Sequence, residues 1–262
     1  MSLADVFATA RAESRAALVG YLPAGFPTVS GSKGYLRSMI DSGCDLLEIG
    51  LPFSDPVIDG PTIQAAAEQA LSAGFRVRDL FDVVSSVADA GGRAVVMTYW
   101  NPVLRYGVDA FARDLAAAGG LGMITPDLIP DEADDWMAAS EAHGLDRIFL
   151  VAPSSTSERI AMTARASSGF LYATAVMGVT GARDVVSSEA PELVARVREH
   201  TSIPVGVGLG VRSGAQAAEI AGFADGVIVG SAFVSAVAEG DSAVRALAAD
   251  LAKGVRSAAA AV

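Results

Sequence analysis

Short runs of consecutive apolar residues recur along the chain, separated by loops and by longer stretches in which apolar residues have helical spacing. Because the runs are apolar at consecutive positions, they are typical of strands buried on both faces of a parallel sheet. The runs predict eight strands, over residues 17–22, 45–50, 94–99, 122–126, 147–152, 170–175, 204–208 and 226–229.

The stretches between these runs have the periodicity of amphipathic helices. Helices are expected over residues 1–13, 33–42, 62–73, 77–90, 108–118, 132–143, 157–166, 189–200, 213–221 and 242–260. Strands that alternate with helices predict parallel βαβ units. With no linker between the units, residues 1–262 are predicted to form one α/β domain, a (β/α)8 TIM barrel with an extra N-terminal helix. An open, doubly wound sheet remains the alternative.

In such a barrel the loops that follow the strands meet at one face, where active sites lie. Two of these loops are long for a connection from a strand to a helix, at residues 51–60 and 177–188. Long loops at this face are candidate lids or partner surfaces.

Glycines dominate the loops after the last two predicted strands. Gly208 and Gly210 follow the seventh strand, and Gly230 with Ser231 follows the eighth, where a short helix is expected to begin. Glycine lets a ligand approach the backbone, and a helix N-terminus offers free N–H groups to an anion. The pair of loops therefore predicts a phosphate site, although glycines that only satisfy tight turns would give the same pattern.

Composition and charge narrow the class of protein. Apolar residues make up 52% of the chain, and the net charge of -11 argues against nucleic-acid binding, which needs clustered lysine and arginine. The single cysteine, Cys44, excludes an internal disulfide. Neither a signal peptide nor a membrane-spanning stretch is recognisable, so we expect a cytoplasmic protein that binds no membrane.

The residue inventory leaves few reaction mechanisms open. The two lysines, Lys33 and Lys253, fall on predicted helices away from the strand ends, which removes Schiff-base chemistry. His143 and His200 lie at predicted helix ends, where the helix dipole favours them. With one cysteine besides, no metal site is expected. Acid–base chemistry by carboxylates remains.

Two carboxylates stand out. Glu48 lies inside an apolar run, where a buried charge is costly unless it is paired. It either pairs with an arginine or a backbone group, or it faces the barrel mouth with a raised pKa and transfers protons. Asp59 ends the long loop just before Pro61, so it is either a second functional acid or an acid favoured at a helix start. Asp55, taken alone, fits a turn.

The stretch LEIGLPFSDPVIDGPTIQ, residues 47–64, resembles the signature of the tryptophan synthase alpha subunit family. The resemblance continues through essentially the whole chain, in residues 97–102, 125–128, 178–181, 206–210 and 230–231. It implies a lyase of tryptophan biosynthesis, a barrel that cleaves indole-3-glycerol phosphate to indole and glyceraldehyde 3-phosphate in a retro-aldol reaction.

The resemblance also implies roles for single residues. Glu48 resembles the general acid–base that moves protons between the glycerol hydroxyl and indole C3, and Asp59 resembles the carboxylate that holds the indole N–H. Tyr172 resembles an active-site tyrosine, although an aromatic side chain that fills the barrel would give the same pattern. Thr180 resembles a loop threonine that contacts the catalytic Asp, and Gly181 a loop glycine that closes over the phosphate.

The family works with a pyridoxal-phosphate-dependent beta subunit, as an alpha2beta2 heterotetramer. The resemblance therefore implies this partner, and no cofactor in the present chain. Five residues match positions near the subunit contact: Pro52, Asp55, Pro56, Tyr99 and Asn101.

Two positions depart from the commoner family pattern. Phe26 replaces a frequent Asp, and Val176 stands where some members have Arg, which concerns lid hydrogen bonds and signalling between subunits. Two other functions stay open. One is another phosphosugar barrel enzyme, such as indole-glycerol-phosphate synthase, whose catalytic lysines have no counterpart here. The other is a ligand-binding barrel that only activates a partner.

Overall fold

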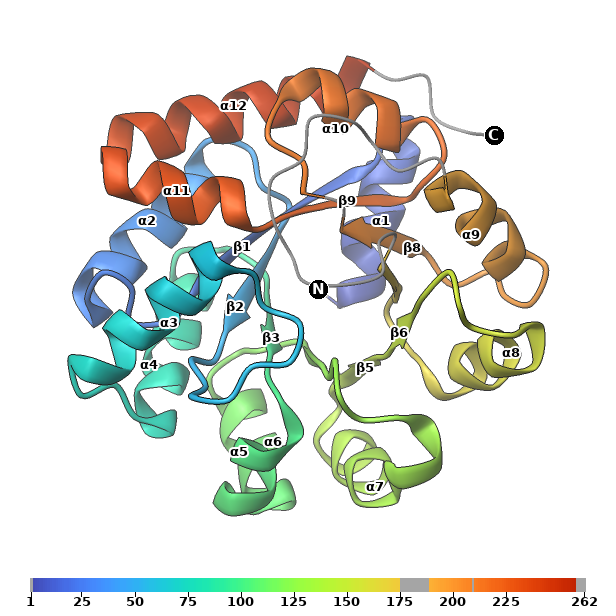
Figure 1. Cartoon of the computed structure of the whole chain (residues 1–262), viewed down its shortest axis with the longest axis horizontal. Coiled ribbons are helices and arrows are strands. Elements are labelled where there is room, and N and C mark those ends of the chain that lie inside the picture. The colour runs from blue at the N-terminus through green and yellow to red at the C-terminus, as the bar shows by residue number, and fades with distance from the viewer. Residues whose placement is uncertain (1, 175–188, 209, 258–262) are drawn as a thin grey trace.

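The computed structural model describes residues 2–174, 189–208 and 210–257 (Figure 1). Strands among these residues pair only in parallel. They are β1 (Ala17–Pro23), β2 (Leu46–Gly50), β3 (Ala94–Met97), β4 (Gly122–Ile124), β5 (Asp146–Ile148), β6 (Leu150–Val151), β7 (Leu171–Thr174), β8 (Val205–Gly208) and β9 (Gly226–Val229).

The order of the strands closes the sheet into a barrel. Neighbouring strands follow the order β5-β4-β3-β2-β1-β9-β8-β7-β6. The two end strands, β5 and β6, are separated along the chain by Phe149 alone, so the sheet returns to where it began. Together they form the single strand predicted at residues 147–152. The (β/α)8 barrel is therefore confirmed, and the open sheet is wrong.

The helices lie outside the strands, and Figure 1 shows those from α2 to α9 as a ring around them. The helices are α1 (Leu3–Ala12), α2 (Val29–Asp41), α3 (Pro61–Ser72), α4 (Val77–Asp89), α5 (Trp100–Tyr106), α6 (Val108–Ala117), η1 (Pro130–Glu132, a 3-10 turn), α7 (Asp134–His143), α8 (Ser157–Ala166), α9 (Glu189–Arg198), α10 (Gly214–Ala221), α11 (Ser231–Glu239) and α12 (Asp241–Ser257). Within the described ranges, every helix is too short or too polar to cross a bilayer.

Two helices differ from the prediction. α2 begins at Val29, before the expected start at residue 33, because the side chain of Thr28 accepts a hydrogen bond from the backbone of Gly31 and caps the helix. α5 was not expected from the sequence. It is only seven residues long and ends at Gly107, whose φ of 98° suits glycine. This helix lies directly after β3 and forms part of the mouth of the barrel.

The core has two layers. Inward-facing side chains of the strands, among them Val19, Leu46 and Val95, form one cluster with the apolar face of α1. Phe7 of α1 packs against Phe170, with ring centroids 5.3 Å apart. α1 thus covers one end of the barrel interior, the end away from Glu48, and the other end is left for the site. The larger apolar cluster fills the space between the strands and the outer helices.

Candidate active site

Glu48 lies on the inner wall of the barrel. It follows Leu46 on the inward-facing side of β2 and pairs in register with Tyr21 of β1 and Val95 of β3. Its side chain is buried, and its Oε2 atom has no hydrogen-bond partner among the described residues. Neither an arginine nor a backbone group neutralises this oxygen, so the alternative of a structural ion pair finds no support.

Burial raises the pKa of Glu48 to about 8, and the nearby charge of Asp59 contributes in the same direction. A carboxyl group with this pKa holds its proton at neutral pH and can give it to a substrate. The pKa is raised because the apolar wall of the barrel disfavours the charged form of Glu48.

Asp59 reaches the same region from the loop after β2. Its Oδ1 accepts a hydrogen bond of 3.1 Å from the hydroxyl of Tyr99, and its backbone carbonyl accepts one from the side chain of Gln64. Burial raises the pKa of Asp59, and the bond from Tyr99 opposes that shift. Gly60, and not Asp59, is the residue that caps α3. The two carboxylates therefore differ in environment, as a division of acid–base roles requires.

Tyr99 is the residue that holds the loop in place. Its hydroxyl accepts hydrogen bonds from the backbone N–H groups of Val57 and Ile58, 3.1 Å each, and donates the one to Asp59. Burial raises the pKa of Tyr99 to about 12, so the hydroxyl stays protonated. The sequence placed Tyr99 only near the subunit contact and missed this positioning role. An aromatic residue at a strand end was the available signal.

Asp127, in the loop after β4, binds the backbone at the start of α5. Its carboxylate accepts hydrogen bonds of 2.9 and 3.2 Å from the backbone N–H of Trp100, at the start of α5. The loop after β4 is thereby tied to the residue that follows Tyr99. The contact fixes the start of α5, so Tyr99 has little freedom to move away from Asp59.

Two tyrosines flank Glu48 inside the barrel, Tyr21 buried and Tyr172 half-buried. Tyr172, predicted to bind substrate, lies on β7, and burial together with the charge of Glu48 raises its pKa well above the usual value. Tyr21, on β1, has its pKa raised by burial and then by Asp59 and Glu48. The structure brings Glu48, Asp59 and Tyr172 together as predicted, and adds Tyr21, which the sequence did not single out.

The predicted phosphate residues lie at the ends of the last two strands. Gly208 ends β8, Gly210 has a φ of 66° that favours glycine, and Gly230 immediately precedes Ser231, the first residue of α11. A Cβ atom on Gly208 would come within 2.4 Å of the Tyr172 hydroxyl. The backbone of this loop therefore lies against the aromatic wall of the site.

The remaining lid residues are outside the described part of the chain. Thr180 and Gly181, expected to contact Asp59 and the phosphate, fall within residues 175–188, as does the family departure at Val176. At the other departure from the family pattern, the half-buried side chain of Phe26 packs against the outer core.

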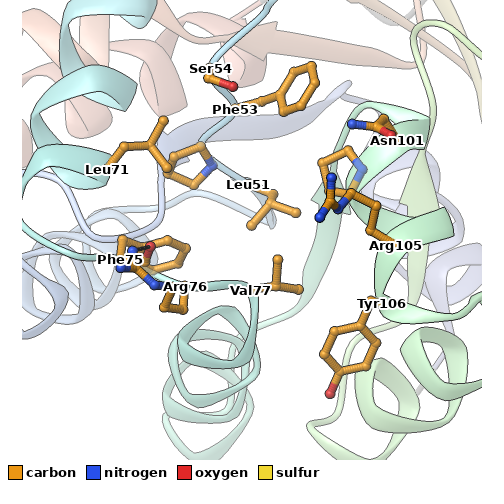
Figure 2. Close-up of a pocket in the computed structure, with 12 residues that line it drawn as sticks. Leu51, Phe53, Ser54, Leu71, Phe75, Arg76, Val77, Asn101, Arg105 and Tyr106 are labelled. Carbon is orange, nitrogen blue, oxygen red and sulfur yellow. Dashed lines mark hydrogen bonds between the residues drawn. The ribbon is translucent and has the colours of Figure 1, made fainter.

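Two of the predicted partner-contact residues, Pro52 and Asn101, line a surface cavity of about 430 Å³. Figure 2 shows Leu51 and Val77 in the middle of it, Phe75 on one side and Asn101 on the other. Asp55 and Pro56 continue the loop that carries Pro52 toward its tip.

Apolar side chains are exposed around this face. Val57, at the tip of the loop after β2, is 70% exposed, and Leu104 on α5 is 51% exposed. Val57 belongs to the loop that carries Pro52, and Leu104 to the helix that carries Asn101, so both lie on segments that line the cavity.

Within the described residues, no group of His, Cys, Asp and Glu side chains is placed to hold a metal ion.

Comparison with known proteins decides the family. A model of the family described as "Tryptophan synthase alpha chain" matches residues 7–262. This chain belongs to the tryptophan synthase alpha chain family. It is 70% identical over 256 residues to the tryptophan synthase alpha chain of Nocardia farcinica, covering 98% of this chain and 96% of that one.

Solved structures of tryptophan synthase have the same fold as this chain. A chain of Mycobacterium tuberculosis tryptophan synthase has a TM-score of 0.94 at 65% identity, over 97% of this chain and 98% of that one. The alpha subunit from Legionella pneumophila strain Paris has a TM-score of 0.86 at 32% identity, over 97% and 98% of the two chains. The predicted family is therefore confirmed, together with the lyase function in tryptophan synthesis, the beta-subunit partner and a cofactor that belongs to the partner.

Proposed function

We propose that this chain cleaves indole-3-glycerol phosphate to indole and glyceraldehyde 3-phosphate with Glu48 and Asp59 as its catalytic residues. The observation that carries this proposal is the buried Glu48, whose Oε2 lacks a partner and whose pKa is raised to about 8 beside a second carboxylate. Perturbed carboxyl groups in a barrel mouth are typical of acid–base catalysis.

The raised pKa gives the order of proton transfers. Glu48 begins protonated and donates its proton to indole C3, which leaves positive charge on the ring nitrogen. The Asp59 carboxylate accepts a hydrogen bond from the indole N–H and stabilises that charge. The Glu48 carboxylate then takes the proton of the glycerol hydroxyl nearest the ring, the C–C bond breaks, and an aldehyde and indole form. Glu48 ends protonated, so the cycle balances.

The phosphate end of the substrate is assigned to the backbone of Gly208, Gly210, Gly230 and Ser231. The N-terminus of α11, which begins at Ser231, supports this assignment because its N–H groups and dipole favour an anion. From the family resemblance, Thr180 and Gly181 are assigned to a lid that closes over the phosphate and excludes water.

Pro52, Asp55, Pro56 and Asn101 are assigned to the contact with the beta subunit in an alpha2beta2 heterotetramer. The cavity lined by Pro52 and Asn101 and the exposed Val57 beside it support the assignment. The loop that carries the first three of these residues ends at Asp59. A contact there has a short path to the catalytic carboxylate. Pyridoxal phosphate belongs to the beta subunit.

The test is indole release from indole-3-glycerol phosphate by the purified chain, alone and with its beta subunit. Glu48→Gln should abolish release while the protein stays folded, because an amide cannot transfer the proton. Asp59→Asn should strongly reduce release and leave phosphate binding largely intact. If Glu48→Gln turned over at the rate of the unmodified chain, the role of Glu48 would be wrong. Release by neither preparation would favour the binding-only barrel.

A further inference from the structure

Tyr21 spans the distance between the phosphate end and the carboxylates. A Cβ atom built on Gly230, at the start of α11, would lie 3.5 Å from ring carbon Cδ1 of Tyr21. One built on Gly50, two residues beyond Glu48 on the inward-facing side of β2, would lie 2.3 Å from the Tyr21 hydroxyl. The ring therefore begins beside the phosphate loop, and its hydroxyl ends above Gly50, next to Glu48.

The Tyr21 hydroxyl is not engaged by the described part of the chain. No hydrogen bond from it to any described residue exists, although the side chain is only 8% exposed. The other tyrosine of the site that reaches Asp59, Tyr99, makes three hydrogen bonds through its hydroxyl. Unlike Glu48 Oε2, the hydroxyl oxygen is not among the fully buried unpaired atoms of the described residues, so it faces the open mouth of the barrel, where a ligand can reach it.

The substrate has one part that fits this place. Its phosphate lies at Gly230 and its indole ring at Asp59 under the proposed function, on which this inference rests. The segment between them is the glycerol chain, whose hydroxyl nearest the ring loses its proton to Glu48. Gly50 leaves the room that the phenol needs, because any larger residue there would meet the ring itself, at 2.7 Å.

We propose that the Tyr21 hydroxyl donates a hydrogen bond to the oxygen of the glycerol hydroxyl nearest the ring, and so selects substrates that carry this hydroxyl. The hydroxyl is never ionised near neutral pH, since burial and the two carboxylates raise the pKa of Tyr21. It is therefore always a donor. As the substrate oxygen loses its proton, the same bond stabilises the negative charge that develops on it.

The test compares two ligands on one protein. In complex with the beta subunit, a Glu48→Gln chain is titrated calorimetrically with indole-3-glycerol phosphate and with 3-(indol-3-yl)propyl phosphate, which lacks both hydroxyls. Adding Tyr21→Phe should weaken binding of the first ligand about fivefold, as expected for one hydrogen bond. It should change binding of the second by less than about twofold. Tyr35→Phe, on α2, is the matched control and should change neither.

Two results would overturn the proposal. Equal weakening of both ligands would mean that Tyr21 only shapes the cavity, and no weakening of either would mean that its hydroxyl touches no substrate atom. A chain with Tyr21 intact that bound neither ligand would instead contradict the proposed function, and the role of Tyr21 with it. With Glu48 present, Tyr21→Phe should lower kcat about tenfold, whereas loss of packing alone would raise KM.

Discussion

The hydroxyl oxygen of Tyr99 lies 3.1 Å from Oδ1 of Asp59. This hydroxyl oxygen of Tyr99 also accepts hydrogen bonds from the backbone N–H groups of Val57 and Ile58. One atom at the end of β3 therefore fixes both the loop after β2 and the carboxylate at the end of that loop. Asp59 depends on this contact for its position, because the rest of the loop has no regular secondary structure.

Removal of the Tyr99 hydroxyl should misplace the Asp59 carboxylate without removing either catalytic carboxylate. In Tyr99→Phe, two partly buried N–H groups lose their acceptor and Asp59 loses a donor, which should destabilise the loop by about 1–3 kcal/mol. We expect indole release to fall at least about tenfold, because the misplaced carboxylate no longer meets the indole N–H. Steady-state kinetics and a denaturant titration would measure the two effects.

Tyr106→Phe is the control for that experiment. Tyr106 also donates a hydrogen bond to a carboxylate, that of Asp114, but on the outer side of the barrel between α5 and α6. The Tyr106→Phe substitution should leave the rate of indole release by the isolated chain unchanged. Equal loss of activity in the two variants would show that the Tyr99 effect is a general cost of losing a hydroxyl.

The pKa of Glu48 predicts how activity changes with pH. Because the acid form begins the reaction, kcat/KM of the isolated chain should fall as the pH rises through about 8. A fall centred near the ordinary pKa of a glutamate would contradict the assignment. The pH profile of kcat/KM, which reports the free chain, is the measurement.

The same shift predicts a change in stability. The folded chain holds the Glu48 proton up to a pH of about 8, whereas the unfolded chain releases it near 4.5, the ordinary pKa of a glutamate. The folded state thus binds more protons in this window, so the free energy of unfolding should decrease as pH rises through it. Glu48→Gln has no proton to lose and should flatten this part of the curve. Urea titrations of both chains between pH 4.5 and about 8 measure this free energy. If Glu48 had an ordinary pKa, the free energy of unfolding would change with pH in the same way in both chains.

The sequence was sufficient for the features that depend on local pattern. Consecutive apolar residues located the strands, and the lone acid among them located Glu48. The fifth run split at Phe149 into β5 and β6, which pair on opposite sides, with β4 and with β7. A hydrophobic run does not record at which residue the pairing passes from one neighbour to the other.

The features that the sequence missed depend on contacts across the barrel. Tyr99 and Asp59 are 40 residues apart along the chain. Tyr21 faces Glu48 through the pairing of β1 with β2. No periodicity links such residues, so only the closed sheet reveals that Tyr21 and Tyr99 lie beside the two carboxylates.

Gly208 should be intolerant of a side chain. A Cβ atom there would lie 2.4 Å from the Tyr172 hydroxyl and 3.1 Å from two of its ring carbons, so Gly208→Ala must displace the tyrosine or the phosphate loop. We expect KM for indole-3-glycerol phosphate to rise at least about tenfold, because the phosphate contacts and the aromatic wall move together. Kinetics at saturating and limiting substrate would measure this.

Gly34→Ala is the matched control for Gly208. Gly34 lies on the exposed face of α2, and nothing is within 4 Å of a Cβ atom added there. Alanine at this helical position should stabilise the protein by about 1 kcal/mol and leave KM unchanged. If Gly208→Ala also left KM unchanged, the loop after β8 would not be the phosphate site.

The exposed loop tip should contribute to binding of the beta subunit. Val57 is 70% exposed and is adjacent to Pro56 and close to the cavity that Pro52 and Asn101 line. Val57→Asp places a charge where the partner would bury an apolar side chain, so we expect the subunit affinity to fall at least about tenfold. Its backbone N–H still donates to Tyr99, so basal cleavage by the isolated chain should persist. Ala249→Asp, exposed on α12, is the control. Titration of each variant with the beta subunit would contradict the assigned contact if the two variants bound equally well.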